Sequence, residues 1–411
     1  MSRLLESIRV IECAVLRNGD NLGMLLGDLG ADVIKVESPA RGDYLRIIGG
    51  QITPQHSRGH VHFNRNKRSV TIDLRSPEGQ AVFWDLFATA DVFVDGFTAG
   101  ACDKLGIGYE QQRERNPGIV YCQYSGFGVR SPYARIPTHG QMMDALAGKL
   151  PTEMGTDGFL HPRRQQGYPS GAQTGGEGTF TGALYAVQYV LAALLRKGIT
   201  GLGTFIDVAA ADACVTSAST HLANDLNAHR LTDTSGAATV ENGENTSARY
   251  QFYETSDQHV ILFCGIEQKF WENFCRAIDR LDLLQGDASA GEVDFGNDQA
   301  LRAEMQAIFH QRPVSEWLQI AADHDIAMGP AHRNIDELRA DEHFAAREVF
   351  VEGHHPHAGP FTYLGRPAVI DGDVFEVRRP APLLGEQTDE ILAELGYDAD
   401  RIAVLRSART V

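Results

Sequence analysis

The sequence lacks several features that mark well-known functional classes. Its 411 residues contain no Walker loop, and no G-x-G-x-x-G follows a strand to open a helix. None of the six cysteines forms a C-x-x-C pair, and most lie in apolar runs, which indicates buried, reduced thiols. The net charge is −17, so the chain has no basic excess with which to bind nucleic acid.

Signals for secretion or membrane insertion are also missing. The first ten residues carry Arg3, Glu6 and Arg9 and contain no apolar signal core. The most apolar run, residues 183–195, is about five residues shorter than a bilayer-spanning helix requires. We therefore expect a cytoplasmic protein with no membrane contact.

What the sequence does contain is typical of a globular α/β protein. Apolar residues make up 43% and charged residues 22%, and the length favours two domains. Short apolar segments alternate with helical patterns through the first half of the chain. This alternation predicts a parallel sheet covered by helices on both faces. The expected strands are 8–12, 32–36, 91–95, 119–124 and 203–208, and the expected helices are 22–29, one opening at 76–79, and 178–197.

Beyond residue 230 the pattern changes. A polar stretch at 232–247 indicates a linker, and a hairpin at 250–263 followed by three helices indicates a small α+β unit. From residue 335 the chain is expected to be rich in loops until a last helix at 387–395. The tract of His354, His355 and His357 is interpreted as a solvated loop, because no fourth metal ligand is indicated. No metal site is expected.

One series of motifs is more specific than any single motif. In order and spacing, the motifs resemble class III CoA-transferases, the formyl-CoA transferase and carnitine-CoA transferase type, over essentially the whole chain. The segments that carry the resemblance are Asp28-Leu29-Gly30-Ala31-Asp32-Val33-Ile34-Lys35-Val36-Glu37, Gly42-Asp43, Asn66-Lys67-Arg68-Ser69-Val70, Asp95-Gly96-Phe97, Tyr124-Ser125-Gly126-Phe127-Gly128 and Leu384-Gly385-Glu386.

The resemblance implies an architecture and a ligand. It implies a Rossmann-like large domain built from residues 1–228 and 336–411, a linker and small α+β domain at 229–335, and an interlocked dimer. The ligand implied is a coenzyme A thioester, bound as substrate, and no cofactor is implied. By position, the CoA contacts would be Arg17, Gly96, Phe97 and Lys104, with Asn66, Lys67 and Arg68 as helpers.

The sequence departs from the family where the reaction takes place. In the family an Asp attacks the acyl thioester and forms a mixed anhydride, which the thiolate reopens. That Asp falls on Thr179, or on Gly178 if the helix start is shifted by one residue. A second family carboxylate falls on Gly140, and His139 replaces a usual Tyr. In the same comparison Gly96 replaces an Asn, and a Gly-Pro has become Gly19-Asp20.

These departures favour a subunit without its own nucleophile. A paralogous chain would carry the Asp, in a heterodimer or heterotetramer. Within the family, succinyl-CoA:benzylsuccinate CoA-transferase consists of two related chains. By analogy we expect succinyl-CoA as donor and a dicarboxylic or aromatic acid as acceptor, in aromatic degradation for example.

Three alternatives stay open at this point. Glu177 lies beside the missing Asp, and its carboxylate would make the chain a self-sufficient transferase if it reached the thioester. An acyl-CoA racemase would use His139 and Glu177 as two acid/base groups on opposite faces of the α-carbon. A CoA-binding module without enzymatic activity is the third alternative.

Overall fold

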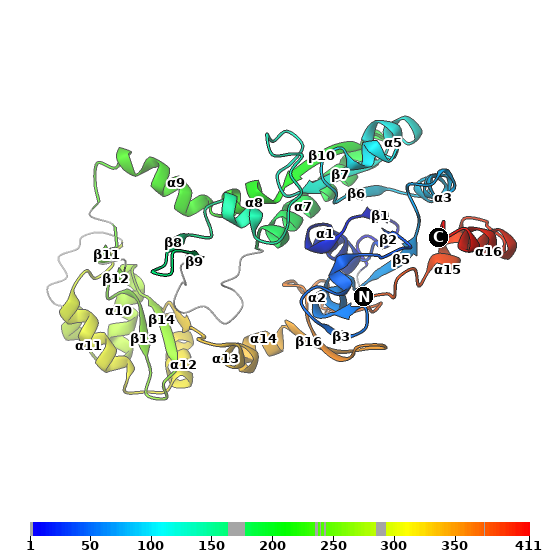
Figure 1. Cartoon of the computed structure of the whole chain (residues 1–411). Helices are drawn as coiled ribbons and strands as arrows, with labels where there is room; N and C mark the ends of the chain where they lie inside the picture. Colours follow the sequence, from blue (N-terminus) through cyan, green and yellow to red (C-terminus); the bar gives the residue numbers. More distant parts are fainter. Residues whose placement is uncertain are drawn as a thin grey trace. The chain divides into compact units, whose positions relative to one another are not determined.

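The computed structural model describes residues 3–162, 177–234, 237–238, 240–241, 244–284, 293–373 and 375–411. The chain divides into two compact units, and we describe each by itself (Figure 1). The larger unit comprises Met1–Gln165, Ala172–Leu222 and Glu342–Val411, so it is built from both ends of the chain. The smaller unit contains Ala223–Asp341.

A six-stranded parallel sheet forms the centre of the larger unit, in the order β10-β7-β6-β1-β2-β5. When these strands are numbered along the chain, the order is that of a Rossmann fold, 3-2-1-4-5-6. Chain order reverses between β1 and β6. The prediction of an α/β fold with a parallel sheet is confirmed. The strands are β1 (Arg9–Cys13), β2 (Asp32–Glu37), β5 (Lys67–Thr71), β6 (Val92–Asp95), β7 (Val120–Ser125) and β10 (Thr204–Ala209).

Helices cover both faces of this sheet and form two apolar clusters (Figure 1). Alternate strand residues point to opposite faces, so Ile11 and Phe93 enter one cluster while Val10 and Val92 enter the other. The first face is covered by α3 (Pro77–Phe87), α15 (Thr388–Glu394) and α16 (Ala399–Ser407). The second is covered by α1 (Leu16–Asp28), α7 (Glu177–Thr200) and α8 (Ala210–Ser217).

Helix α7 is longer than its most apolar run. Within the described residues, Gly178–Thr200 is long and apolar enough to cross a membrane by length and composition alone, with 39% of its most apolar window buried. The apolar run at residues 183–195 is thus only the central part of this longer helix. Ala183, Ala186 and Val190 on its inner face are fully buried in the second cluster, as in the core helix of a globular domain.

The C-terminal part of the chain returns to the sheet edge. Its backbone joins β5 through Gln387 N–H, which donates to Ser69 O at 3.0 Å. The predicted loop-rich region proves to contain a hairpin of β16 (Phe350–His355) and β17 (Gly359–Leu364). The predicted last helix is α15, but a further helix, α16, follows it. Alternation in the hairpin is irregular, and the apolar residues of α16 do not gather on one face, which explains why neither was predicted.

Shorter elements connect these layers in the larger unit. They are η1 (Tyr44–Arg46), β3 (Gln51–Thr53), β4 (His56–Ser57), α2 (Arg58–Phe63), α4 (Ala101–Lys104), α5 (Tyr109–Arg115), α6 (Met142–Leu146), β8 (Thr152–Met154), β9 (Leu160–Pro162) and α14 (Glu342–Ala346); α9 (Ser219–Asn227) begins in this unit.

The smaller unit is an antiparallel sheet with helices packed on one face. Tyr253 and Phe263 point from the sheet into a core with Trp271, Phe309 and Trp317. The predicted hairpin and three helices are all present. They are β13 (Tyr250–Glu254), β14 (Val260–Cys264), α10 (Gln268–Ala277), α11 (Gln299–Phe309) and α12 (Val314–His324), joined by β15 (Met328–Pro330) and α13 (Ile335–Ala340), with a short pair β11 (Val240–Glu241) and β12 (Glu244–Asn245) before them.

Strands β1, β2 and β5, helix α1 and the loop after β2 together contribute a fully buried network of ionic side chains, which we call the lysine network: Lys35, Lys67, Glu12, Asp20 and Asp43. Lys35 contacts carboxylate oxygens of Glu12 and Asp43 at 2.9 Å and also pairs with Asp20. Lys67 pairs with Glu12 at 2.8 Å. Burial opposes charge on Lys35, but the surrounding carboxylates raise its pKa well above the ordinary value. Lys35 is therefore held charged in the core.

Replacing Lys35 by Met should destabilise the larger unit strongly. The change leaves three buried carboxylates without their shared cation, and breaking a buried ion pair in this way costs about 3–5 kcal/mol. The matched control is Lys197→Met, because Lys197 pairs with Asp91 at 2.8 Å but is 23% exposed. We expect that control to cost at most about 1 kcal/mol. Urea unfolding of both variants measures the difference, and equal losses would contradict a central role for Lys35.

Candidate active site

A cavity of about 1450 Å³ opens in the larger unit at the carboxyl ends of β1 and β6. The chain order of the sheet reverses between these two strands, and open α/β sheets bind their ligands at such a point. Loops that follow β1, β2, β6 and β7 supply most of the wall, and the first turn of α7 adds Thr179. This cavity is the candidate active site.

The cavity wall carries cationic side chains although the chain as a whole is acidic, with a net charge of −17. A locally cationic wall suits an anionic ligand such as a phosphate group. Sequence reasoning identified only Arg17 and Lys104, because isolated basic residues in loops resemble ordinary surface charges. The cationic residues on the wall are Arg17, Arg41, Arg75, Lys104 and Arg135.

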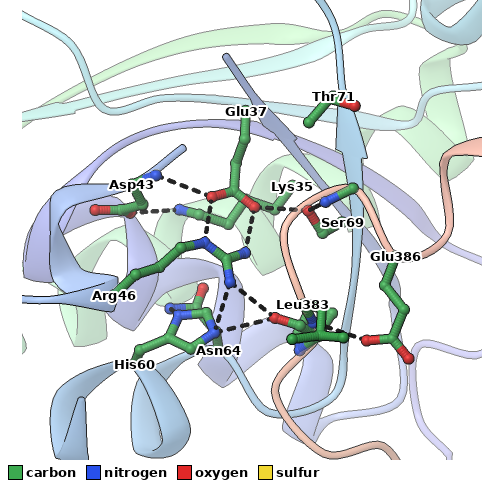
Figure 2. Close-up of polar contacts among 12 residues, drawn as sticks. Lys35, Glu37, Asp43, Arg46, His60, Asn64, Ser69, Thr71, Leu383 and Glu386 are labelled. Carbon is green, nitrogen blue, oxygen red and sulfur yellow. Dashed lines mark hydrogen bonds and ion pairs between the residues drawn. The ribbon is translucent and has the colours of Figure 1, made fainter. Parts of the chain in front are cut away.

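The turn between β1 and α1 forms one continuous stretch of the wall, residues 14–18. Leu16 in this turn has a φ of 62°, which is uncommon for a residue with a side chain. Its backbone N–H donates to both carboxylate oxygens of Asp43, at 3.0 and 3.1 Å. Burial would raise the pKa of Asp43, but the charge of Lys35 and backbone donors lower it to about 2. Asp43 is therefore ionised, and Figure 2 shows its carboxylate facing Lys35.

The loop after β6 brings Gly96 and Phe97 to the wall, where the sequence placed them. Asp95 holds this loop, since its carboxylate accepts from Phe97 N–H at 3.0 Å and from the Tyr121 hydroxyl at 2.7 Å. Burial raises the pKa of Asp95 to about 6, even though both donors favour the ionised form. A Cβ at position 96 would lie 2.5 Å from the Cβ of Ala14, so close packing explains the glycine.

Asn66, Lys67 and Arg68, the predicted helpers in CoA binding, are not among the described residues that line the cavity. All three are buried in or beside β5. Lys67 belongs to the lysine network through Glu12, and Arg68 pairs with Glu394 of α15 at 2.6 Å. Their side chains connect β5 to neighbouring elements, and these pairings allow a strand of polar residues to be buried.

Thr179 lies at the start of α7 and lines the cavity, while Gly178 has no room for a side chain. A Cβ at Gly178 would lie 2.6 Å from Sγ of Cys214. The Thr179 carbonyl accepts from the hydroxyl of Tyr124 at 2.7 Å, which fixes this turn. Of the two positions expected for the missing Asp, Thr179 lines the cavity, whereas a side chain at Gly178 would require Cys214 to move. Glu177 begins the helix, but its side chain lies outside the described residues.

His139 and Gly140 also line the cavity, just before α6. Gly140 has a φ of 50°, and a Cβ there would have no atom within 4 Å. Space for a second carboxylate is thus present but unused. Asp144, in α6, is buried and accepts from Gly178 N–H at 3.1 Å. Sequence reasoning missed Asp144, which holds the first turn of α7 and so helps place Thr179.

The histidine tract serves the fold of the hairpin. His355 is buried, and its Nδ1 accepts from the backbone N–H groups of His357 and Ala358 at 3.1 Å. Its Nε2 lies 2.9 Å from the carbonyl oxygen of Ala381. Across the part of the chain that the structure describes, no group of three or more His, Cys, Asp or Glu residues is placed to hold a metal ion. The interpretation of this tract as a solvated loop was therefore wrong for His355.

Comparison with known proteins gives consistent matches over nearly the whole chain. The sequence model described as CoA-transferase family III matches residues 5–388. The human succinyl-CoA:glutarate CoA-transferase is 29% identical over 409 residues, which cover 99% of this chain and 90% of the human protein. The succinyl-CoA:mesaconate CoA-transferase of Haloarcula marismortui is 31% identical over 402 residues, covering 96% and 97% of the two chains.

Solved structures show the same fold. A CaiB/BaiF family protein from Brucella suis is 27% identical, with a TM-score of 0.69. That alignment covers 94% of this chain and 98% of the other. A protein from Mycobacterium tuberculosis is 25% identical, with a TM-score of 0.74 and the same two coverages. The structural likeness thus extends over both units of this chain.

The stability of the chain should depend on pH through Asp95. Its pKa of about 6 in the folded chain lies above the ordinary value of about 3.9, so the folded chain binds this proton more tightly. That stabilisation is fully present below about pH 4 and is lost as the pH rises through the folded pKa. Asn resembles the protonated acid and cannot titrate. Relative to wild type, Asp95→Asn should gain on the order of 2–3 kcal/mol between about pH 4 and about pH 7.

Urea unfolding of both proteins at the two pH values gives this difference directly. The informative result is how the stability difference between the variant and wild type changes with pH. Asp43, whose pKa is lowered, has the opposite pH dependence, but it is present in both proteins and cancels in the difference. A difference between variant and wild type that stays constant with pH would contradict the assignment.

Proposed function

The chain belongs to CoA-transferase family III, and from this membership we propose that it is the non-catalytic subunit of a heteromeric CoA-transferase. The enzyme moves coenzyme A between an acyl-CoA, with succinyl-CoA as donor, and a carboxylic acid. A paralogous chain supplies the Asp nucleophile. The observation that supports the proposal is Thr179, which lines the cavity at the position where we expect that Asp; a side chain at the other candidate, Gly178, would meet Sγ of Cys214.

The cavity supports the binding of an acyl-CoA. It lies where α/β folds bind nucleotides, and five cationic side chains on its wall suit the phosphate groups of CoA. Arg17, Phe97 and Lys104 are the contacts we propose for CoA, and Arg41 and Arg75 add to them on the same wall. Two of the relatives compared above have succinyl-CoA in their names, which supports succinyl-CoA as the donor.

The chemistry explains why Thr179 does not replace an Asp. Transfer through an enzyme-bound anhydride needs a nucleophile that attacks the thioester and then becomes a good leaving group. A carboxylate meets both requirements at neutral pH. A threonine hydroxyl is a weak nucleophile without an adjacent base, and the ester it forms is much less reactive toward a thiolate than an anhydride.

Apolar surface supports assembly with a second chain. On α7, Phe180 and Leu184 are 42% and 49% exposed, and Leu195 and Ile199 are 74% and 87% exposed. These positions recur at helical spacing and form one exposed stripe. Large exposed apolar surfaces mark protein interfaces. An interlocked dimer would bury far more than the roughly 1,600 Å² of a standard interface.

Three other functions are distinguished by experiment. A transferase that uses Glu177 places its nucleophile two residues before Thr179, at the first residue of α7. A racemase would need an acid/base partner for His139, which lines the cavity. A CoA-binding module without enzymatic activity would use the same cavity to bind CoA, and it would differ from the transferase subunit only in not taking part in catalysis.

The pure chain should not transfer CoA from succinyl-CoA to glutarate, whereas Thr179→Asp should gain this activity. The new carboxylate would point into the cavity from the family's position, and Thr and Asp are similar in size. Product formation is followed by liquid chromatography, and acylation of the protein by trapping with hydroxylamine and intact-protein mass. Thr179→Asn is the matched control, since it has the same shape but no nucleophile.

Several outcomes would contradict the proposal. Turnover by the unaltered pure chain that disappears in Glu177→Gln, with folding intact, would establish the self-sufficient transferase. Exchange of the α-proton of a 2-methylacyl-CoA in heavy water that is lost in His139→Ala would establish the racemase. Thr179→Asp that binds CoA but is never acylated would show that the position is assigned incorrectly.

The native protein should purify as a complex with a paralogous chain in equal amounts. Replacing the Asp of that partner by Asn should abolish CoA transfer, while Thr179→Ala in this chain should only reduce it. Mass analysis of the purified complex identifies the second chain, and assays of the two variants compare the sites. An active, symmetric dimer of this chain alone would contradict the heteromer.

A further inference from the structure

A strained backbone residue stands at the entrance to α1. Leu16 is the first residue of this helix and has a φ of 62°, in the left-handed region that favours glycine. The residue before it, Val15, gives no side-chain cap to the helix. Strained residues of this kind persist only where surrounding contacts hold them, and they gather at functional sites. The contacts that hold Leu16 are therefore informative.

Asp43 is the group that holds Leu16 from one side. Both of its carboxylate oxygens accept from Leu16 N–H, and one also accepts from Leu45 N–H at 2.7 Å. Its own N–H donates to Glu37 at 3.0 Å, and Glu37 is fixed by Arg46 (Figure 2). The carboxylate is thus fixed in position by groups that do not belong to the turn.

Lys35 holds the other side of the same turn. Its Nζ donates to the carbonyl oxygen of Ala14 at 3.0 Å and lies 2.9 Å from Oδ2 of Asp43. Ala14 and Leu16 are two residues apart, so the turn is attached at both ends to one buried ion pair. Lys35 itself comes from β2, the neighbouring strand of β1.

Arg17 is the residue that this arrangement directs. It follows Leu16 directly, it lies on the cavity wall, and its guanidinium stands 5.9 Å from the ring centre of Phe63. The direction of the Arg17 side chain depends on the backbone angles of Leu16. An ordinary φ at Leu16 would turn the chain differently and move Arg17 away from its present place.

We propose that Asp43 and Lys35 are positioning residues that hold the strained Ala14–Leu16 turn so that Arg17 meets the phosphates of an acyl-CoA. The proposal rests on the proposed function of the cavity as a CoA site. Neither Asp43 nor Lys35 lines the cavity, so each acts through the turn and not by touching the ligand.

The test is a double-mutant cycle on the affinity for free coenzyme A, measured by titration calorimetry with the full chain. Asp43→Asn removes the charge and one acceptor and should weaken binding about tenfold, the scale of a lost charge-assisted hydrogen bond. Arg17→Ala should weaken binding by a similar factor. In the double variant, we expect at most about a further twofold loss of affinity, because both changes remove the same contact, that of Arg17 with CoA.

A merely stabilising role predicts a different result. In that case Asp43→Asn lowers the melting temperature and leaves the affinity for CoA unchanged. Alternatively, the losses of affinity caused by Asp43→Asn and Arg17→Ala multiply in the double variant. Either outcome overturns the inference. If Asp43→Asn does not fold, Asp43→Glu carries the same cycle, since it keeps the charge beside Lys35 and displaces the carboxylate from Leu16. With either Asp43 variant, the inference is supported if the substitution weakens CoA binding in the wild-type background but adds little further loss when Arg17 is already replaced by Ala.

The matched control is Asp298→Asn in the smaller unit. Asp298 also caps a helix, accepting from Ala300 N–H at 2.7 Å, and it does not line the cavity. Its CoA affinity should equal that of wild type. Failure of the wild-type chain to bind coenzyme A would overturn the proposed CoA site and this inference together. Normal binding by wild type and by Asp43→Asn would overturn the inference alone.

Discussion

Two lysines without contact to water organise the larger unit. The side chains of Lys35 and Lys67 are fully buried, and a buried charge is tolerated only where opposite charges surround it. Glu12, Asp20 and Asp43 meet this need from β1, α1 and the loop after β2. Any shift in strand register would leave charges unpaired. Electrostatics therefore adds specificity to a core that apolar packing alone would define less strictly.

The same network explains which parts of the fold could be predicted from the sequence. Apolar strands such as β6 and β7 can be predicted from their composition, and so can the long helix α7. β5 does not, because its Lys67, Arg68 and Ser69 are the residues of a surface loop in any local view. Their burial depends on partners such as Glu12 and Glu394, which are distant in sequence. A single sequence carries no local sign of such pairs.

The candidate site follows the same division. Gly96, Phe97, Arg17 and Lys104 were predicted as CoA contacts through resemblance to a family, and all four line the cavity. Asp43 belongs to one of the motifs that carry this resemblance, but its role became visible only when the structure brought it to Leu16. Asp43 is bound into the core, whereas Thr179 stands in the first turn of α7 and Gly140 in the loop before α6, both on the cavity wall. Neither position takes part in the lysine network, so nothing in that network fixes which residue occupies it.

Residues 387–411 cover one face of the sheet that the N-terminal residues begin. Gln387 bonds to Ser69, Thr410 accepts from Asp73 N–H at 2.7 Å, and the apolar face of α3 is covered by α15 and α16. On the ribosome, all strands of the sheet emerge well before this cover does. The nascent chain must therefore keep an apolar face protected until α15 and α16 have emerged, and chaperones bind such faces. Removal of α16 alone would leave part of this apolar face open to aggregation.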